Sequence, residues 1–146
     1  MRKPKPPPPV IEELVAAIER TTPSYYISEH ERWVDDEAIL NITARIEAIG
    51  KKHKHLIGST LDLSLTCSRR FDRDEGETTG GRPWLHGLRL TKDGCFAGAS
   101  LHADVFWALR SMITAGQINH VNLRYQNPRY GSAALLSIAF DPPSMN

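Results

Sequence analysis

The segment from Ala38 to Ala48 alternates between small or aliphatic side chains and polar ones. Successive side chains of a strand point to opposite faces, so this pattern predicts a β-strand with one buried and one solvated face. Such strands are typical of antiparallel sheets that pack one face on a core. The buried face is predicted to hold Ala38, Leu40, Ile42, Ala44, Ile46 and Ala48, and the wet face Asn41, Thr43, Arg45 and Glu47.

Further strands are predicted from alternation and from β-branched or aromatic content. Leu61, Leu63 and Leu65 are predicted to face the core, with Asp62 and Ser64 in solvent. Asp35 and Asp36 are predicted to turn the chain after the first strand, and Lys92-Asp93-Gly94 to form a three-residue hairpin loop. The predicted strands cover residues 25–34, 38–49, 57–67, 84–91, 95–101, 118–125 and 132–140.

Two helices are predicted from apolar residues at helical spacing. The first covers residues 10–20, with Val10, Ile11, Leu14, Val15 and Ile18 on one face. The second covers residues 103–115, begins near a capping serine, Ser100, and ends at Gly116, which suits a C-terminal cap. Its predicted buried stripe is Val105, Phe106, Leu109, Met112 and Ile113.

The predicted fold class is therefore α+β and β-rich, with about seven mostly antiparallel strands and two helices. Strands that follow one another as hairpins argue against a doubly wound sheet. A single curled sheet and a sandwich both fit the pattern. Residues 10–146 are predicted to form one domain, and residues 1–9 a flexible, basic, proline-rich tail whose deletion should leave the melting temperature nearly unchanged.

Composition narrows the classes of function. The 146 residues are 40% hydrophobic and 24% charged, with a formal net charge of +1, which argues against a nucleic-acid binder driven by overall charge. No segment reaches the ~18 apolar residues of a membrane helix, and the start of the chain does not resemble a secretory signal. We therefore expect a cytoplasmic protein.

Cys67 and Cys95 are interpreted as buried thiols, with a disulfide between them as the alternative.

Motifs for catalysis or cofactor binding are weak. His53 and His55 lie among lysines that repel a cation, so no metal site is predicted, and no cofactor fingerprint occurs. Ser100, His102 and Asp104 are neighbours at a strand–helix junction, and capping explains them better than a catalytic triad, whose members converge from distant segments. Residues 68–83 are predicted to form a long charged loop.

Trp107 is predicted to lie opposite the buried stripe of the second helix, near Arg110. An exposed tryptophan indicates a contact surface, and arginine beside aromatic residues is common at interaction sites. The predicted binding residues are Trp107, Arg110, Arg124, Arg129 and Tyr130.

Two hypotheses follow. The first is a non-enzymatic interaction or binding module, with a protein partner or self-association, and with a small-molecule ligand left open. The alternative is a small hydrolase or lyase with its site beneath the 68–83 loop, where acids and arginines would act with His86 and His120. A deep pocket that gathers one of these histidines with a carboxylate would favour the enzyme.

Overall fold

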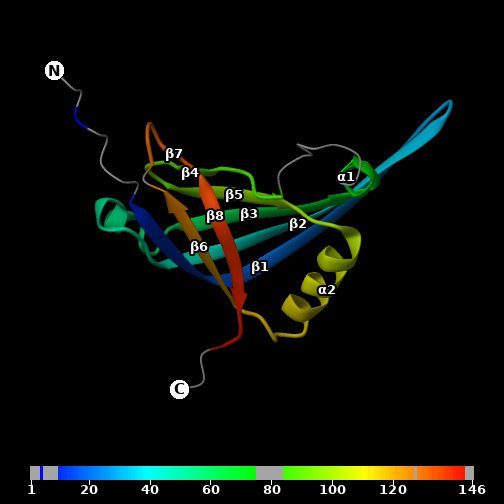
Figure 1. Ribbon diagram of the computed structural model, residues 1–146. Coiled ribbons are helices and arrows are strands. Elements are labelled where there is room, and N and C mark those ends of the chain that lie inside the picture. Colours follow the sequence, from blue (N-terminus) through cyan, green and yellow to red (C-terminus); the bar gives the residue numbers. More distant parts are fainter. Residues whose placement is uncertain (1–3, 5–9, 75–83, 127, 144–146) are drawn as a thin grey trace.

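The computed structural model describes residues 4, 10–74, 84–126 and 128–143. Its strands form one mixed sheet in the order β7-β4-β5-β3-β2-β1-β6-β8 (Figure 1). β3 and β5 are parallel, and the other neighbouring pairs are antiparallel. The strands are β1 (Ile11–His30), β2 (Trp33–Ala48), β3 (Thr60–Ser68), β4 (Leu88–Leu90), β5 (Gly94–Ser100), β6 (His120–Gln126), β7 (Ser132–Ala133) and β8 (Leu135–Asp141).

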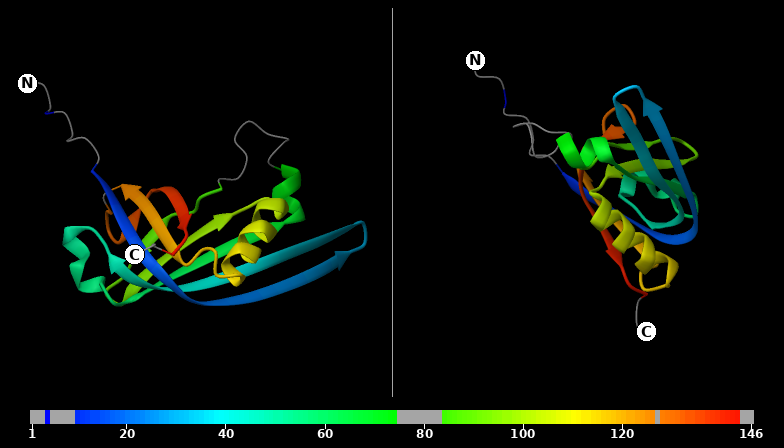
Figure 2. Two further views of the ribbon diagram at one scale, coloured as in Figure 1. Left: turned by 90° about the horizontal axis from the view of Figure 1, so that it is seen from below. Right: turned by 90° about the vertical axis from the view of Figure 1, so that its right-hand side faces the viewer.

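The sheet is strongly curled, so that β6 and β8 run across the direction of β3 and β5 (Figure 2). This confirms the β-rich α+β class, but the described residues form eight strands and three helices instead of about seven and two. Of the two predicted architectures, the strands form the single curled sheet. The helices in the described ranges are η1 (Lys51–Leu56), a 3-10 helix, then α1 (Arg69–Asp74) and α2 (Ala103–Thr114). η1 occupies the predicted turn after Gly50, and α1 occupies the start of the predicted 68–83 loop. None of these helices is long and apolar enough to cross a bilayer.

The alternation of the central strands is confirmed. β2 pairs with β3 so that Ile42 lies beside Leu63 and Leu40 beside Leu65, and all four side chains are buried. Ile46 and Leu61 are buried with them, whereas Thr43, Arg45, Asp62 and Ser64 keep contact with solvent. Ala48, which was predicted on the buried face, is exposed at the end of β2. A slip of one residue would have exchanged the two faces, so the sequence pattern fixes the register here.

The predicted helix over residues 10–20 is wrong, because this segment is the first half of β1. The fully buried positions are Leu14 and Ala16, which are two residues apart as in a strand. β6 pairs with residues 11–17 on one side of this segment, and β2 pairs along the other side. The spacing of the apolar residues fits a strand as well as a helix, and hydrogen bonding to strands on both sides decides for the strand.

The turn predicted at Asp35 and Asp36 is also wrong. β1 continues to His30, the chain turns at Glu31 and Arg32, and both aspartates lie within β2. Residues 25–36 therefore form a projecting β-hairpin, called here the hairpin arm (Figures 1 and 2). β2 is joined to β3 only from Glu37 onward, so the sheet gives the arm little lateral support.

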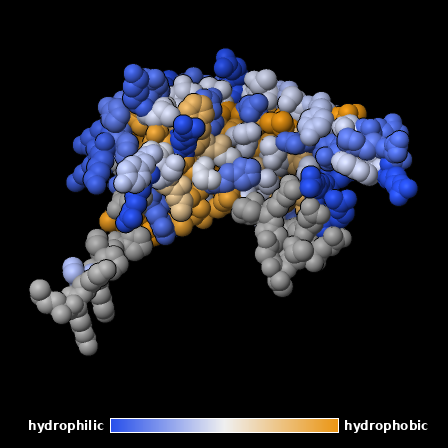
Figure 3. Space-filling model, turned by 90° about the horizontal axis from the view of Figure 1, so that it is seen from above, coloured by the Kyte–Doolittle hydropathy of each residue, from blue (hydrophilic) through white to orange (hydrophobic). Residues whose placement is uncertain are grey.

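The hairpin arm carries unusually many exposed apolar side chains. It holds five of the 14 large hydrophobic residues that are exposed in the described part of the chain. Charged residues, among them Glu31 and Arg32, occupy its tip, and the projecting end of the molecule is coloured hydrophilic in Figure 3. The exposed apolar residues are Tyr25, Tyr26, Ile27, Trp33 and Val34.

The predicted second helix is confirmed as α2, and it packs against the curled sheet through Phe106, Leu109 and Ile113. Val105 and Met112, which were expected in the buried stripe, are 41% and 37% exposed. Gly116 has φ 75°, and its N–H donates to the Ile113 carbonyl, so it ends the helix as predicted.

Ser100 does not cap α2, contrary to prediction. His102 occupies the N-cap position without a side-chain hydrogen bond to the helix.

Cys67 and Cys95 are free and buried, as the thiol interpretation expected. The predicted tail lies almost wholly outside the described residues, and so do residues 75–83 of the predicted long loop.

Candidate binding groove

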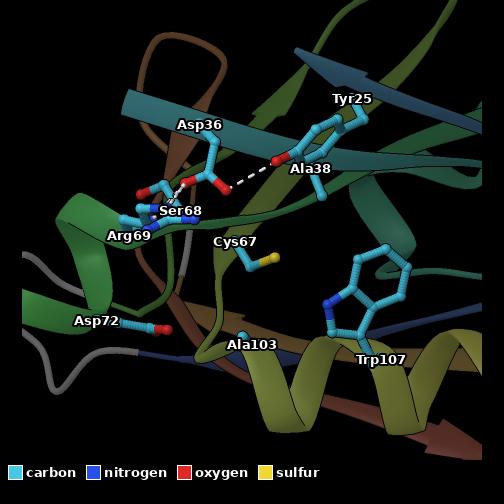
Figure 4. Close-up of a pocket in the computed structure, with 9 residues that line it drawn as sticks. All are labelled: Tyr25, Asp36, Ala38, Cys67, Ser68, Arg69, Asp72, Ala103 and Trp107. Atoms are coloured by element: carbon cyan, nitrogen blue, oxygen red, sulfur yellow. Dashed lines mark hydrogen bonds and ion pairs between the residues drawn. The ribbon is translucent and has the colours of Figure 1, made fainter. Parts of the chain in front are cut away.

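Two adjoining pockets lie between the hairpin arm and α2. Their volumes are about 390 Å³ and 250 Å³, and Tyr25, Ala38 and Trp107 line both. We call the combined hollow the groove. Figure 4 shows Tyr25 and Trp107 on opposite sides of the first pocket, with Ala38 and Cys67 between them. The other residues that line the groove are Ser68, Arg69, Asp36, Asp72 and Ala103 in the first pocket, and Pro23, Ser24, Ile39, Phe106 and Arg110 in the second.

The two aromatic walls come from separate elements. Tyr25 reaches the groove from β1, at a position paired with Ala38 of β2. Trp107 reaches it from α2, because it follows Phe106 by one residue and is rotated about 100° from that buried side chain. The side chains are 57% and 46% exposed, so both rings can accept a ligand.

Neighbouring side chains hold Trp107 in place. Its ring meets that of Phe106 edge to face, with the centroids 5.1 Å apart and the planes at 88°. The guanidinium carbon of Arg110 lies 5.5 Å from the centre of the Trp107 ring, close enough for a cation–π contact. One wall of the groove is therefore a tryptophan packed against a buried phenylalanine.

Asp36 organises the polar end of the groove. It accepts a hydrogen bond of 2.9 Å from the Tyr25 hydroxyl, and the Arg69 Nε atom lies 3.2 Å from its other oxygen. Burial opposes ionisation of Asp36, but the hydrogen bonds from Tyr25 and Arg69 outweigh it and keep the pKa of the carboxyl below its usual value. The arm is thus tied to the start of α1 through a charged carboxylate.

Asp72 supplies a second carboxylate from α1. Its Oδ1 atom lies 2.8 Å from His102 Nδ1 at the start of α2. The His102 ring in turn contacts Phe71 and Trp84, at centroid distances of 5.3 Å and 4.9 Å. This cluster joins α1 to α2 and holds the polar end of the groove in place. The Asp72 side chain is still 37% exposed, so a cationic group can reach it.

Cys67 lies at the floor of the first pocket. Burial raises the pKa of its thiol to about 11, and the backbone hydrogen bond to Ala38 only partly offsets this effect. A thiol with such a pKa stays protonated near neutral pH and is a poor nucleophile. The floor therefore contributes an apolar contact to the groove.

The structure brings together two of the five predicted binding residues, Trp107 and Arg110. Arg124 lies on β6 and faces Glu13 of β1 at 3.7 Å. Arg129 and Tyr130 lie in the connection from β6 to β7, where Tyr130 has φ 53° and is fully exposed. These three residues are not part of the groove.

Sequence reasoning missed Tyr25 and Asp36 as members of this site. The misplaced turn at Asp35 and Asp36 put Asp36 in a loop instead of a strand. Residues 33–38 read Trp-Val-Asp-Asp-Glu-Ala and do not alternate, so the only local signal for a longer strand was the aromatic and β-branched pair at its start.

The histidines of the enzyme hypothesis do not meet. His86 Nε2 lies 2.9 Å from the Ser100 hydroxyl, which neighbours Thr66, whereas His120 contacts Glu47 and Asn119. Three strands separate β5 from β6 in the sheet, and the two histidines contact different partners. His102 pairs with Asp72, not with Ser100.

Among the described residues, no group of three or more histidine, cysteine or acidic side chains gathers as a metal site would. A further pocket of about 380 Å³ lies on the other side of Arg69 and is lined by Trp33, Val34, Asp35 and the arginines of α1.

No protein-family model, curated protein or solved structure matches the chain.

The bond between Tyr25 and Asp36 leads to a titration prediction. This bond raises the pKa of Tyr25 above its ordinary value of 10.0, because the carboxylate stabilises the protonated phenol. Tyr25 should therefore ionise later than a free tyrosine, and Asp36→Ala should lower its pKa toward 10.0. The stability gained from this bond is complete between about pH 3.8 and pH 10.0, the ordinary pKa values of the two groups. It is lost as the pH rises through the raised pKa of Tyr25 or falls through the lowered pKa of Asp36.

The titration can be followed by NMR of the tyrosine ring carbons, with Tyr25→Phe to assign the signal. Tyr26 is a useful internal comparison, because its raised pKa comes chiefly from Glu37 and only to the smallest extent from Asp36, so Asp36→Ala should lower the pKa of Tyr26 less than that of Tyr25. Identical Tyr25 titrations in the wild type and in Asp36→Ala would contradict the hydrogen bond.

Proposed function

We propose that the chain is a non-enzymatic binding module that holds an extended protein segment in the groove between the hairpin arm and α2. The observation that carries this proposal is the pair of exposed rings, Tyr25 and Trp107, which line both pockets from separate elements. Tyrosine, tryptophan and arginine are the residues that most often dominate binding energy at protein interfaces. The groove has all three, with Arg110 beside Trp107.

The form of the groove supports an extended partner. Aromatic-lined grooves commonly recognise peptide segments that carry little conformational freedom of their own. One end of this groove is polar, with Asp36, Arg69 and Asp72, and the middle is apolar, with Ala38 and Cys67. A segment with an apolar centre and a charged end would match both parts.

The contacts within the groove favour binding over catalysis. A general acid or base needs a free position toward the substrate. The Asp36 carboxylate is already held by Tyr25 and Arg69, and its lowered pKa keeps it charged and a weak base near neutral pH. Cys67 is a neutral thiol there. The groove thus supports recognition more strongly than proton transfer or nucleophilic attack.

Selection from a displayed library of random linear peptides tests this proposal. Peptides enriched on the wild-type protein should bind Tyr25→Ala and Trp107→Ala at least tenfold more weakly, because a central aromatic residue contributes about 2 kcal/mol or more to binding. Tyr130→Ala is the matched control, since Tyr130 is an exposed aromatic residue outside the groove. Circular dichroism would show that each variant is folded.

Two outcomes would overturn the proposal. One is that no peptide is enriched on the folded wild-type protein. The other is that the enriched peptides bind Tyr25→Ala and Trp107→Ala as well as the wild type. If, in the second case, Tyr130→Ala weakens peptide binding, the binding surface would instead lie at the connection between β6 and β7.

A further inference from the structure

We propose that the groove takes the proline-rich basic segment, residues 2–9, of a second copy of this chain, so that copies associate head to tail. This inference rests on the proposed function, because it names the occupant of the same groove. Three observations carry it: the chemistry of the segment, the charge of the groove, and the length of chain between the two.

The segment has the composition that aromatic grooves recognise. Residues 6–9 are four consecutive prolines, preceded by Arg2, Lys3 and Lys5. Consecutive prolines favour the polyproline II helix, which loses little entropy on binding and presents ring faces to aromatic side chains. Tyr25 and Trp107 provide two such aromatic walls. The prolines would lie between these rings.

An exposed carboxylate at the polar end of the groove is opposite in charge to the segment. Over both pockets the two carboxylates, Asp36 and Asp72, are balanced by Arg69 and Arg110, so the attraction is local to Asp72. The segment carries three cationic side chains and no acidic one. Asp72 is partly exposed, so a lysine ahead of the prolines can approach it while the prolines contact the rings. Such a contact weakens as the salt concentration rises.

The segment cannot occupy the groove of its own chain. Pro9 lies two residues before Ile11, where β1 begins, and Tyr25 lies further along the same strand. An extended strand rises about 3.3 Å per residue, so the 14 steps from Ile11 to Tyr25 span up to roughly 46 Å. Figures 1 and 2 show the start of β1 and the hairpin arm at opposite ends of the sheet. The four prolines and the one linking residue, Val10, reach only about 18 Å. The occupant must therefore come from another copy.

A contact between different surfaces of two copies is heterologous. It forms rings where the rotation closes and open chains where it does not. Each copy then offers one groove and one proline-rich segment. Two variants that each damage one of these parts should fail to self-associate but should bind each other.

The test is sedimentation velocity of the full chain over a range of concentrations. The first variant is Trp107→Ala, which damages the groove and keeps the segment. The second replaces Pro6, Pro7, Pro8 and Pro9 with serine, which keeps the groove. The wild type should associate with rising concentration, and each variant alone should need at least a tenfold higher concentration. An equimolar mixture of the two variants should form a one-to-one complex, while Tyr130→Ala should behave as the wild type.

Three results would overturn the inference: a wild type that stays monomeric, variants that associate alone as strongly as the wild type, or a mixture that stays monomeric. Library peptides that bind the groove while the mixture stays monomeric would reject this occupant and keep the proposed function. If neither the peptides nor the second copy bind, both proposals fail. Circular dichroism of both variants would establish that they fold.

Discussion

Replacing Leu63 with alanine is expected to lower the free energy of unfolding by about 2–5 kcal/mol. Leu63 lies at the centre of β3, 1% exposed, between Ile42 of β2 and Ala97 of the parallel strand β5. Alanine would remove its buried methyl groups and leave a cavity that the paired strands on both sides cannot easily close. Urea denaturation of the two proteins would measure the loss.

Ser64→Ala is the matched control, because Ser64 is the next residue along β3 and points to the opposite face. Its substitution should change stability by about 0.5 kcal/mol or less, as for most surface positions. A large loss with Ser64→Ala together with a small one with Leu63→Ala would mean that the register of β3 is shifted by one residue. The pair therefore tests the faces of the central sheet with two substitutions.

Phe106→Ala is expected to lower the free energy of unfolding by about 3–5 kcal/mol, whereas Trp107→Ala should cost about 1 kcal/mol or less. Phe106 is 2% exposed and belongs to the main core, but Trp107 is 46% exposed and belongs to the groove. Both substitutions remove a large ring from neighbouring positions of the same helix. The difference between the two losses in unfolding free energy therefore reports mainly the greater burial of Phe106.

Thermal melts at low protein concentration would separate the two variants without a contribution from association. If Trp107→Ala destabilises the monomer as strongly as Phe106→Ala, then Trp107 serves the fold, and its role in the groove loses its main support. In that case the peptide-binding experiment would report unfolding instead of recognition. The stability measurement therefore has to precede the binding measurement.

The central strands could be predicted from sequence because each has a simple two-residue alternation. Ile42 and Leu63 mark one buried face, and a shift of one residue would turn that face to solvent. Residues 10–20 were mispredicted, since their apolar spacing fits a helix as well as a strand, and pairing to β6 from the far end of the sequence decides between them. The parallel pairing of β3 with β5 likewise depends on long-range topology.

The candidate site was only partly predictable. Trp107 emerged from the helical wheel, because α2 has a regular amphipathic pattern. Tyr25 and Asp36 did not emerge, since their roles depend on where the hairpin arm turns and on contact with α1. A groove between three elements is a property of their packing, and local patterns specify the elements but not the hollow between them.

The position of β1 has a consequence for the order in which the chain can fold during synthesis. β1 is made first, yet its edge at residues 11–17 is paired with β6, which begins at His120. At about 5–20 residues per second, the ribosome takes on the order of 5–20 s to add the roughly one hundred intervening residues. During that interval Leu14 and Ala16 lie on an unprotected strand edge, open to pairing with other nascent chains. Glu12, Glu13 and the prolines before them are suited to keep that edge soluble until its partner strand emerges.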